Sequence, residues 1–187
     1  MAKSVNNIVT HGMSGKLGDI LVFSQREGKT IVGKVPDWTH VERTDKQKEV
    51  THKFQEAVIY AKTVLLDNEM KEAYQDKAKE GQSAYNVAIA DFFNAPDIES
   101  INLSGYTGQA GQEIVVRAID DFRVKEVSVD IYNSDGTLVE NGNASLSTNG
   151  ADWIYTTSAT NNQVSGDKIV VRASDIPGNL TERQAFL

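Results

Sequence analysis

The chain has 187 residues, of which 40% are hydrophobic and 24% are charged, and its formal net charge is −7. These values exclude a wholly disordered chain, and no apolar run reaches the roughly 18 residues that a membrane-spanning helix needs. The sequence contains no cysteine, which excludes disulfides, thiolate catalysis and cysteine-ligated metals. The three histidines, His11, His40 and His52, are too few to predict a histidine-rich metal site.

Charge is distributed unevenly along the chain. Residues 1–90 carry 13 Lys/Arg and 12 Asp/Glu, a net +1, whereas residues 91–187 carry 6 and 14, a net −8. This difference predicts two modules, of which the acidic one should repel nucleic acid. The N-terminus lacks the roughly 7–15-residue apolar core of a secretory signal. We therefore expect synthesis in the cytoplasm, followed by incorporation in a particle or by export without a signal peptide.

The glycine-rich stretch HGMSGKLGDILVF at residues 11–23 has the composition of a phosphate-binding loop. A nucleotide-binding P-loop has the pattern G-x-x-x-x-G-K-[ST] and leads from a strand into a helix. Here Thr10 replaces the first glycine, Leu17 replaces the hydroxyl residue, and a strand-like run follows Lys16. The stretch is therefore interpreted as a turn that begins a strand, and no nucleotide cofactor is expected.

Residues 18–35 contain two strand-like runs, GDILVFSQ and TIVGKV, with a glycine-containing turn between them. This pattern predicts a β-hairpin. An isolated hairpin is only marginally stable in water, and its open edges can pair with another chain. We therefore expect this hairpin to be covered by helices of its own chain or by another subunit. The candidate assembly interface consists of four apolar residues: Leu21, Phe23, Ile31 and Val32.

Three helices are predicted after the hairpin. Thr44 and Gln47 have the spacing of a capping box, and the first helix should extend from there to Leu66. Apolar residues recur at helical spacing on its predicted buried stripe: Val50, Phe54, Ala57 with Val58, Ala61 and Leu65. A second helix is predicted over residues 69–79, capped by Asn68, and a third from Ser83 to Phe93. Pro96 marks the end of the first module, residues 1–95.

Residues 96–187 contain short alternating segments and no convincing helix. The predicted strands are IESINL, EIVVRAI, KEVSVDIY, TLVENGNA, WIYTTS, KIVVRAS and ERQAFL, with a hairpin turn NSDG at residues 133–136. Seven strands in about 90 residues are typical of an immunoglobulin-like sandwich. The predicted fold is thus an α+β module, a hairpin plus about three helices, followed by an all-β immunoglobulin-like sandwich.

An internal repeat places candidate ligands together. The segment IVVRAID at 114–120 nearly recurs as IVVRASD at 169–175. In a seven-stranded sandwich these would be strands B and F, which run parallel in facing sheets, so their ends should bring Asp120, Asp121, Asp175 and Asn179 to one tip. Clustered carboxylates favour Ca²⁺ as a cofactor, with Asp120, Asp121 and Asp175 as the candidate metal ligands. The alternative is that each aspartate caps its own turn.

Other kinds of site receive less support from the sequence. The basic residues of the first half are interleaved with acidic ones, which predicts a mixed-charge surface and no nucleic-acid site. No G-x-S-x-G or H-E-x-x-H motif occurs, so no catalytic residues are assigned. A carbohydrate platform could involve four aromatic residues: Trp38, Trp153, Tyr155 and Tyr132. The alternative for Trp153 is a place in the core or at the rim of the sandwich.

Two resemblances extend this interpretation. Residues 173–181, ASDIPGNLT, resemble the immunoglobulin-like modules common in bacterial surface and virus-particle proteins. In the first half, the segment GKLGD at 15–19, Gly28-Lys29 with Pro36, the 47–54 helix and SAYNVAIADFFNAP at 83–96 resemble a family of uncharacterised bacterial proteins. That family has a hairpin and helices followed by a sandwich. The resemblance implies architecture only and assigns no activity or functional residue.

These observations favour a non-enzymatic structural or interaction protein. In this hypothesis the N-terminal module assembles into a homo-oligomer or docks on a particle scaffold, and the acidic sandwich is displayed. A virus-like or phage-tail-like particle would suit such a chain, an inference by analogy of fold. The alternative is a ligand-binding module that holds calcium or a glycan at the tip of the sandwich.

Overall fold

The computed structural model of the protein describes residues 2–4, 8–26, 28–37 and 42–187. The chain divides into two units, residues 1–48 and residues 49–187, each of which is described by itself. The division falls within the first helix. The boundary at 95/96 that the sequence indicates stays a prediction.

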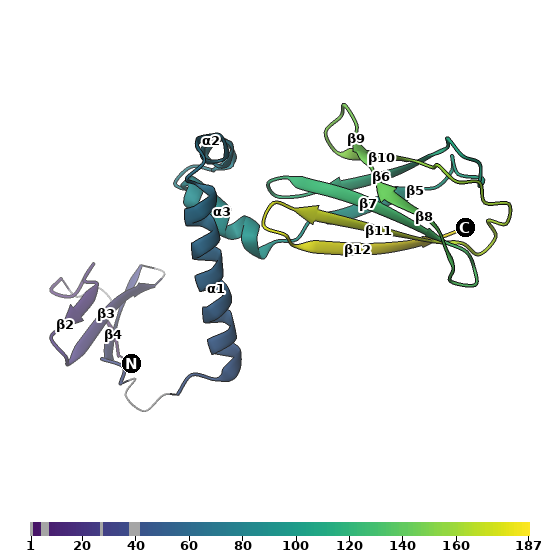
Figure 1. The fold of residues 1–187 in the computed structure, drawn as a ribbon. Helices are drawn as coiled ribbons and strands as arrows, with labels where there is room; N and C mark the ends of the chain where they lie inside the picture. Colours follow the sequence, from purple (N-terminus) through teal and green to yellow (C-terminus); the bar gives the residue numbers. More distant parts are fainter. Residues whose placement is uncertain (1, 5–7, 27, 38–41) are drawn as a thin grey trace. The chain divides into compact units, whose positions relative to one another are not determined.

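The N-terminal unit is a four-stranded antiparallel sheet (Figure 1). Its strands are β1 (Ala2–Ser4), β2 (Gly15–Leu17), β3 (Leu21–Arg26) and β4 (Lys29–Lys34), in the order β1-β4-β3-β2. The predicted hairpin is confirmed as β3 and β4. The two outer strands were missed because three residues are too few to show an alternating pattern. The glycine-lysine segment is itself strand β2, and Gly18, with φ of 57°, lies in the turn that follows it.

The register of this sheet assigns its side chains to two faces. Phe23 pairs with Val32, and Leu21 pairs with Leu17, so these four residues share one face. The loop before β2 is tied to the same face, because Gln25 Nε2 donates a hydrogen bond to the carbonyl oxygen of Met13 over 2.7 Å. Likewise, Thr30 Oγ1 donates to the carbonyl oxygen of Thr10 over 3.0 Å. Among the described side chains of the unit, only that of Thr30 is buried.

The three predicted helices are confirmed as α1 (Asp45–Val64), α2 (Asn68–Lys77) and α3 (Ala84–Phe93). The capping box of α1 forms: Thr44 N donates to Gln47 Oε1 over 3.0 Å, and Gln47 N donates to Thr44 Oγ1 over 3.3 Å. The N-cap predicted for α2 is wrong, since Asp67 caps this helix by accepting from the amide of Glu69. No helix of the described residues combines the length and apolarity needed to cross a membrane.

The buried stripe predicted for α1 extends along only part of the helix. Ala57 and Ala61 are fully buried, but Val50 and Phe54 are 67% and 49% exposed. α1 shares an apolar core with α2 and α3. The residues of α1 and of the turn after it that belong to this core are Ala61, Val64 and Leu65. The helical periodicity thus continues into a part of α1 that this core does not reach.

Residues 97–186 form two further four-stranded antiparallel sheets. The strands are β5 (Asp97–Asn102), β6 (Glu113–Ile119), β7 (Val124–Tyr132), β8 (Leu138–Asn143), β9 (Ser145–Leu146), β10 (Asp152–Thr156), β11 (Lys168–Asp175) and β12 (Leu180–Phe186). Their orders are β5-β6-β10-β9 and β12-β11-β7-β8. All seven predicted strands are confirmed. The inward side chains of both sheets form one core, so the protein is a mixed α+β fold with sandwich-like sheets.

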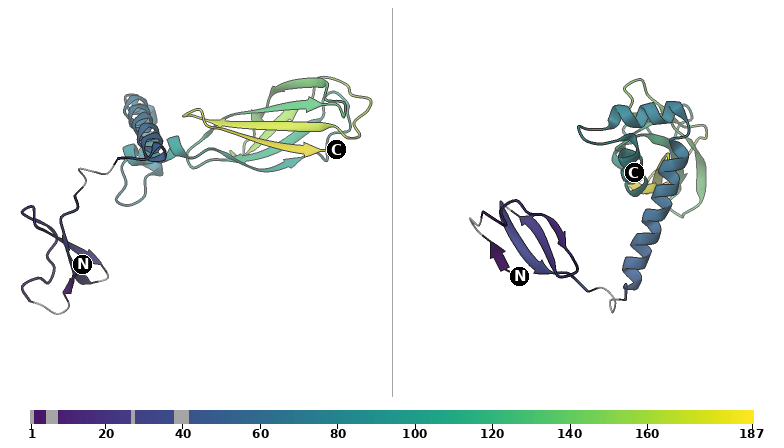
Figure 2. Two further views of the ribbon diagram at one scale, coloured as in Figure 1. Left: turned by 90° about the horizontal axis from the view of Figure 1, so that it is seen from below. Right: turned by 90° about the vertical axis from the view of Figure 1, so that its left-hand side faces the viewer.

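The helices gather at one end of the two sheets (Figures 1 and 2). Phe122, between β6 and β7, and Ile176, between β11 and β12, join the core of the helices. The Phe122 ring stacks on Tyr74 of α2, with ring centroids 3.8 Å apart. The helices therefore cover the end of the sandwich at which β6 and β11 finish.

Candidate functional site

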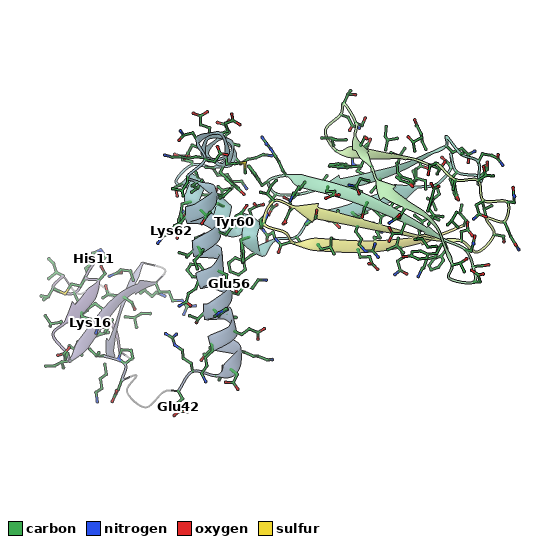
Figure 3. The ribbon with its side chains drawn as sticks, viewed as in Figure 1. His11, Lys16, Glu42, Glu56, Tyr60 and Lys62 are labelled. Atoms are coloured by element: carbon green, nitrogen blue, oxygen red, sulfur yellow. The ribbon has the colours of Figure 1, made fainter. Side chains whose placement is uncertain are left out.

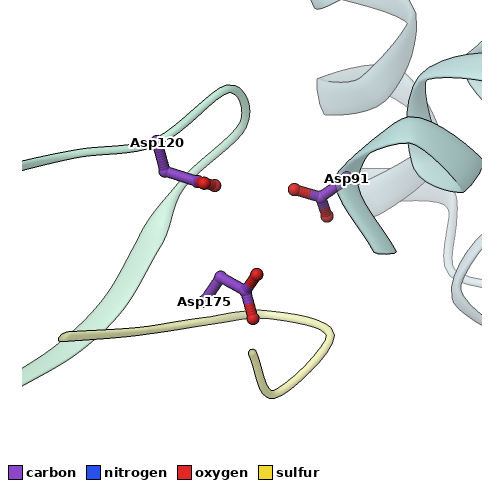
Figure 4. A group of neighbouring side chains, drawn as sticks. All are labelled: Asp91, Asp120 and Asp175. Atoms are coloured by element: carbon purple, nitrogen blue, oxygen red, sulfur yellow. The ribbon is translucent and has the colours of Figure 1, made fainter. Parts of the chain in front are cut away.

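Three carboxylates meet at this junction (Figure 4). Asp91 comes from α3, Asp120 directly follows β6, and Asp175 is the last residue of β11; one oxygen of each lies within 4.8 Å of the others. The internal repeat predicts that Asp120 and Asp175 lie close together, and the structure places them so. The structure adds Asp91, which is not among the candidate metal ligands predicted from the sequence.

Asp120 and Asp175 each cap the turn in which they lie. Asp120 Oδ2 accepts hydrogen bonds from the amides of Phe122 and Arg123, over 3.2 and 2.9 Å. Asp175 Oδ1 accepts from the amides of Gly178 and Asn179, over 2.8 and 2.6 Å. The alternative prediction, that each of these aspartates caps its own turn, is therefore confirmed for Asp120 and Asp175. This capping leaves Asp120 Oδ1 buried, without a hydrogen-bond donor among the described residues.

Asp91 caps no turn and is only 1% exposed. Its Oδ2 accepts a hydrogen bond of 2.6 Å from the hydroxyl of Tyr74, whereas its Oδ1 has no donor among the described residues. Tyr60 of α1 is on the side of the helix that faces α3, and its hydroxyl lies 2.7 Å from that of Tyr74 (Figure 3). Burial raises the pKa of Asp91 to about 7, although the Tyr74 hydrogen bond opposes this shift.

A sequence signal for Asp91 does exist. In α3 the buried residues are Ala84, Ala88 and Asp91, which occupy one face at spacings of four and three. An aspartate at an inward position of an otherwise apolar stripe requires a partner, because an unpaired buried carboxylate is costly.

Two asparagines attach the end of α3 to the loops of the sandwich. Asn179 Nδ2 donates to Asp175 Oδ2 over 2.7 Å and to the carbonyl oxygen of Asn94 over 3.0 Å. Asn94 Nδ2 in turn donates to Asp121 Oδ2 over 2.6 Å. Asp121, predicted as a metal ligand beside Asp120, thus contacts Asn94 and is not part of the group of three carboxylates.

The electrostatic environment of the three carboxylates is unfavourable for three negative charges. None of them forms an ion pair with a Lys or Arg side chain within the described ranges. Burial also raises the pKa of Asp120. Asp91 lies in the last turn of α3, where the helix dipole disfavours negative charge. A proton or a bound cation would relieve this repulsion.

Asp120 also borders a cavity of about 460 Å³. Six other residues line this cavity: Phe93, Asn94, Ala95, Asp97, Ile119 and Asp121. Asp91 and Asp175 do not line this cavity, so it borders the group of three carboxylates at Asp120.

The predicted assembly residues do not all lie together. Leu21, Phe23 and Val32 share one face of the N-terminal sheet, and all three are partly exposed. Ile31 is on the opposite face, because the side chains of successive strand residues alternate. Lys16, which pairs with Val22, is on this second face and projects from β2 (Figure 3).

The three described aromatic residues of the candidate carbohydrate platform do not form an exposed surface together. Trp153 and Tyr155 are only 7% and 4% exposed and belong to the core between the sheets. The Tyr132 ring is covered by Lys168, whose Nζ lies 4.9 Å from the ring centroid. Trp38 lies outside the described residues. Trp153 therefore lies in the core of the sandwich, as the alternative prediction for this residue states.

Comparisons with known proteins give no family. No protein-family model and no curated protein match the sequence. Three solved structures resemble about half of the chain, each with a TM-score of 0.36. They are an engineered protein with 22% identity over 48% of this chain, CopC from Methylosinus trichosporium with 17% over 48%, and the β-glucuronidase of Parabacteroides merdae with 15% over 49%. The aligned parts span 19%, 87% and 13% of those chains, respectively.

Proposed function

We propose that this chain is a non-enzymatic structural or interaction protein that self-associates through its N-terminal sheet. One observation carries the proposal: an apolar face, made by Leu17, Leu21, Phe23 and Val32, in a unit whose described residues include no buried apolar side chain. We also propose that residues 96–187 are an immunoglobulin-like module that this assembly displays.

The size of the N-terminal unit supports self-association. Even a domain of about 60 residues buries only about 60% of the surface of its unfolded chain, and smaller ones usually need oligomerisation or cross-links. This unit has 48 residues, and Ile8, Leu17 and Ile20 are 94%, 62% and 73% exposed. A second copy of the same sheet is the simplest cover, because a two-fold axis brings identical apolar faces together.

The strand order supports the immunoglobulin-like assignment. The orders β5-β6-β10-β9 and β12-β11-β7-β8 correspond to A-B-E-D and G-F-C-C′ of that sandwich. The chain has no cysteine, so apolar packing around Trp153 takes the place of the inter-sheet disulfide of antibody domains. Virus-like or phage-tail-like particles are the setting that we propose for such a display, by analogy of fold.

Size-exclusion chromatography with light scattering, together with negative-stain microscopy, tests the proposal. The full chain should elute as a multiple of 20.5 kDa, and a chain lacking residues 1–36 should be monomeric. Near-UV circular dichroism controls for the fold, because the environment of Trp153 should be unchanged by the deletion. A full chain that is monomeric at every concentration would contradict self-association.

A further inference from the structure

We propose that Asp91, Asp120 and Asp175 bind one divalent cation of the Ca²⁺ type where α3 meets the loops that follow β6 and β11. One oxygen of each carboxylate lies within 4.8 Å of the other two. Calcium binds oxygen at about 2.3–2.6 Å, so ligands on opposite sides of the ion are separated by about twice this distance. A single ion can therefore contact all three residues.

The second observation is the buried, unpartnered oxygen of Asp91. Capping accounts for the positions of Asp120 and Asp175, but Asp91 caps no turn. Its carboxylate is 1% exposed and faces the other two (Figure 4), and its Oδ1 accepts no hydrogen bond from the described residues. A natural chain rarely leaves a buried carboxylate oxygen unpaired, and a cation would satisfy it.

The donor atoms define the class of ion. All three side chains offer hard oxygen ligands, and this group contains no histidine or cysteine, which suits Ca²⁺ better than a transition metal. Ca²⁺ takes 6–8 oxygens at about the distances above, so water molecules would complete the coordination. The hydrogen bonds that Asn179 donates to Asp175 fix the orientation of that carboxylate.

The ion would connect three parts of the fold. Asp91 belongs to a helix, Asp120 follows a strand of one sheet, and Asp175 ends a strand of the other. Binding would therefore fix α3 against both sheets. This inference is independent of self-association, because the N-terminal sheet contributes no residue to the site.

The test uses the full chain after treatment with EDTA. Calorimetric titration with CaCl₂ and thermal melts should show binding by the wild type, with Tm raised by roughly 5–10 °C at a hundredfold excess over Kd. Asp91→Asn and Asp120→Asn should each weaken Kd at least tenfold. Asp135→Asn, in an exposed turn at the other end of β7, is the matched control and should bind as the wild type does.

The melts in EDTA separate binding from folding. Asp91→Asn removes a negative charge and supplies an amide donor to the neighbouring carboxylates, so its Tm without metal should equal or exceed that of the wild type. Three results would overturn the proposal. The first is no heat of binding and no Tm shift for the wild type at millimolar CaCl₂, and the second is a Tm shift in Asp91→Asn and Asp120→Asn as large as that of the wild type. The third is a Tm shift that MgCl₂ produces and CaCl₂ does not.

Discussion

Tyr74 donates a hydrogen bond of 2.6 Å to Asp91 Oδ2 while its ring stacks on Phe122, 3.8 Å away between centroids. One side chain of α2 thus contacts both the buried carboxylate of α3 and the loop that follows β6. The contact explains why Tyr74 is fully buried although its hydroxyl is polar. Burial and its hydrogen bond to Asp91 raise the pKa of Tyr74 well above its usual range, so the hydroxyl remains a donor.

Replacing Tyr74 with Phe should destabilise the protein by about 1–3 kcal/mol, because both oxygens of Asp91 would then lack a protein donor. Urea unfolding followed by circular dichroism measures the change. Tyr85→Phe is the control, since the Tyr85 hydroxyl is less buried and makes no hydrogen bond to the residues that the structure describes. Equal stability of Tyr74→Phe and the wild type would show that the hydrogen bond contributes nothing.

Asn179→Ala should loosen the end of α3. The Asn179 amide donates to the carbonyl oxygens of Phe92 and Asn94, over 3.2 and 3.0 Å, as well as to Asp175. Its loss should cost about 1–2 kcal/mol and speed hydrogen exchange in the last turn of α3. Mass spectrometry after exchange, with exposed Asn162→Ala as control, resolves the effect. Unchanged exchange at residues 90–94 would refute this role.

Much of the fold follows from local sequence signals. The capping box of Thr44 and Gln47 forms as its spacing predicts, and Ser83 caps α3. Strands β6 and β10 alternate buried residues with more exposed ones, as Ile114, Val116 and Ala118 show in β6. These features depend on residues close in the chain, so the sequence is sufficient to predict them.

Several features that depend on distant contacts do not follow from the sequence. Val50 and Phe54 have helical spacing but remain exposed, because burial depends on what lies opposite a helix. The repeat predicts the proximity of Asp120 and Asp175, whereas Asp91 joins them only because α3 packs on the end of the sandwich. Likewise, the register of β3 and β4 determines which face of the sheet carries each of the four predicted assembly residues, and the sequence does not show this register.

Gly108 and Gly111 offer a matched pair of substitutions. Both have positive φ, 87° and 84°, so alanine carries a similar backbone cost of about 1–2 kcal/mol at each. At Gly108 an added Cβ would also overlap the carbonyl oxygen of Asn161 and lie 2.6 Å from Val164 Cγ1, whereas at Gly111 it meets nothing within 4 Å. Thermal melts should therefore show Gly108→Ala to be the less stable by at least about 2 kcal/mol. Equal Tm values would contradict the close approach of Gly108 to residue 161.

Glu140 should make stability depend on acid pH. It is 8% exposed, and its Oε2 accepts hydrogen bonds from the amide and hydroxyl of Ser158 and from the amide of Ala159. Burial alone would raise its pKa, but these hydrogen bonds outweigh burial and hold the pKa below the ordinary 4.5. Because the folded-state pKa is the lower one, the stabilisation is present above pH 4.5 and is lost as pH falls through the folded value.

Glu140→Gln should thus cost about 1–3 kcal/mol at neutral pH and progressively less as pH falls below 4.5. Urea titrations across this range measure the difference between variant and wild type. Glu113→Gln, at the exposed start of β6, is the control. A difference that stays constant with pH would rule out an ionised Glu140 as the source.

Sedimentation velocity of two variants, each with a substitution at one of two neighbouring residues of β3, tests self-association most directly. Phe23 is on the apolar face with Val32, whereas Val22 is on the opposite face, where it pairs with Lys16. Phe23→Glu should therefore sediment as a 20.5 kDa monomer, while Val22→Glu should remain assembled like the wild type. A wild type that is already monomeric, or a Phe23→Glu variant that assembles as the wild type does, would contradict the proposed interface.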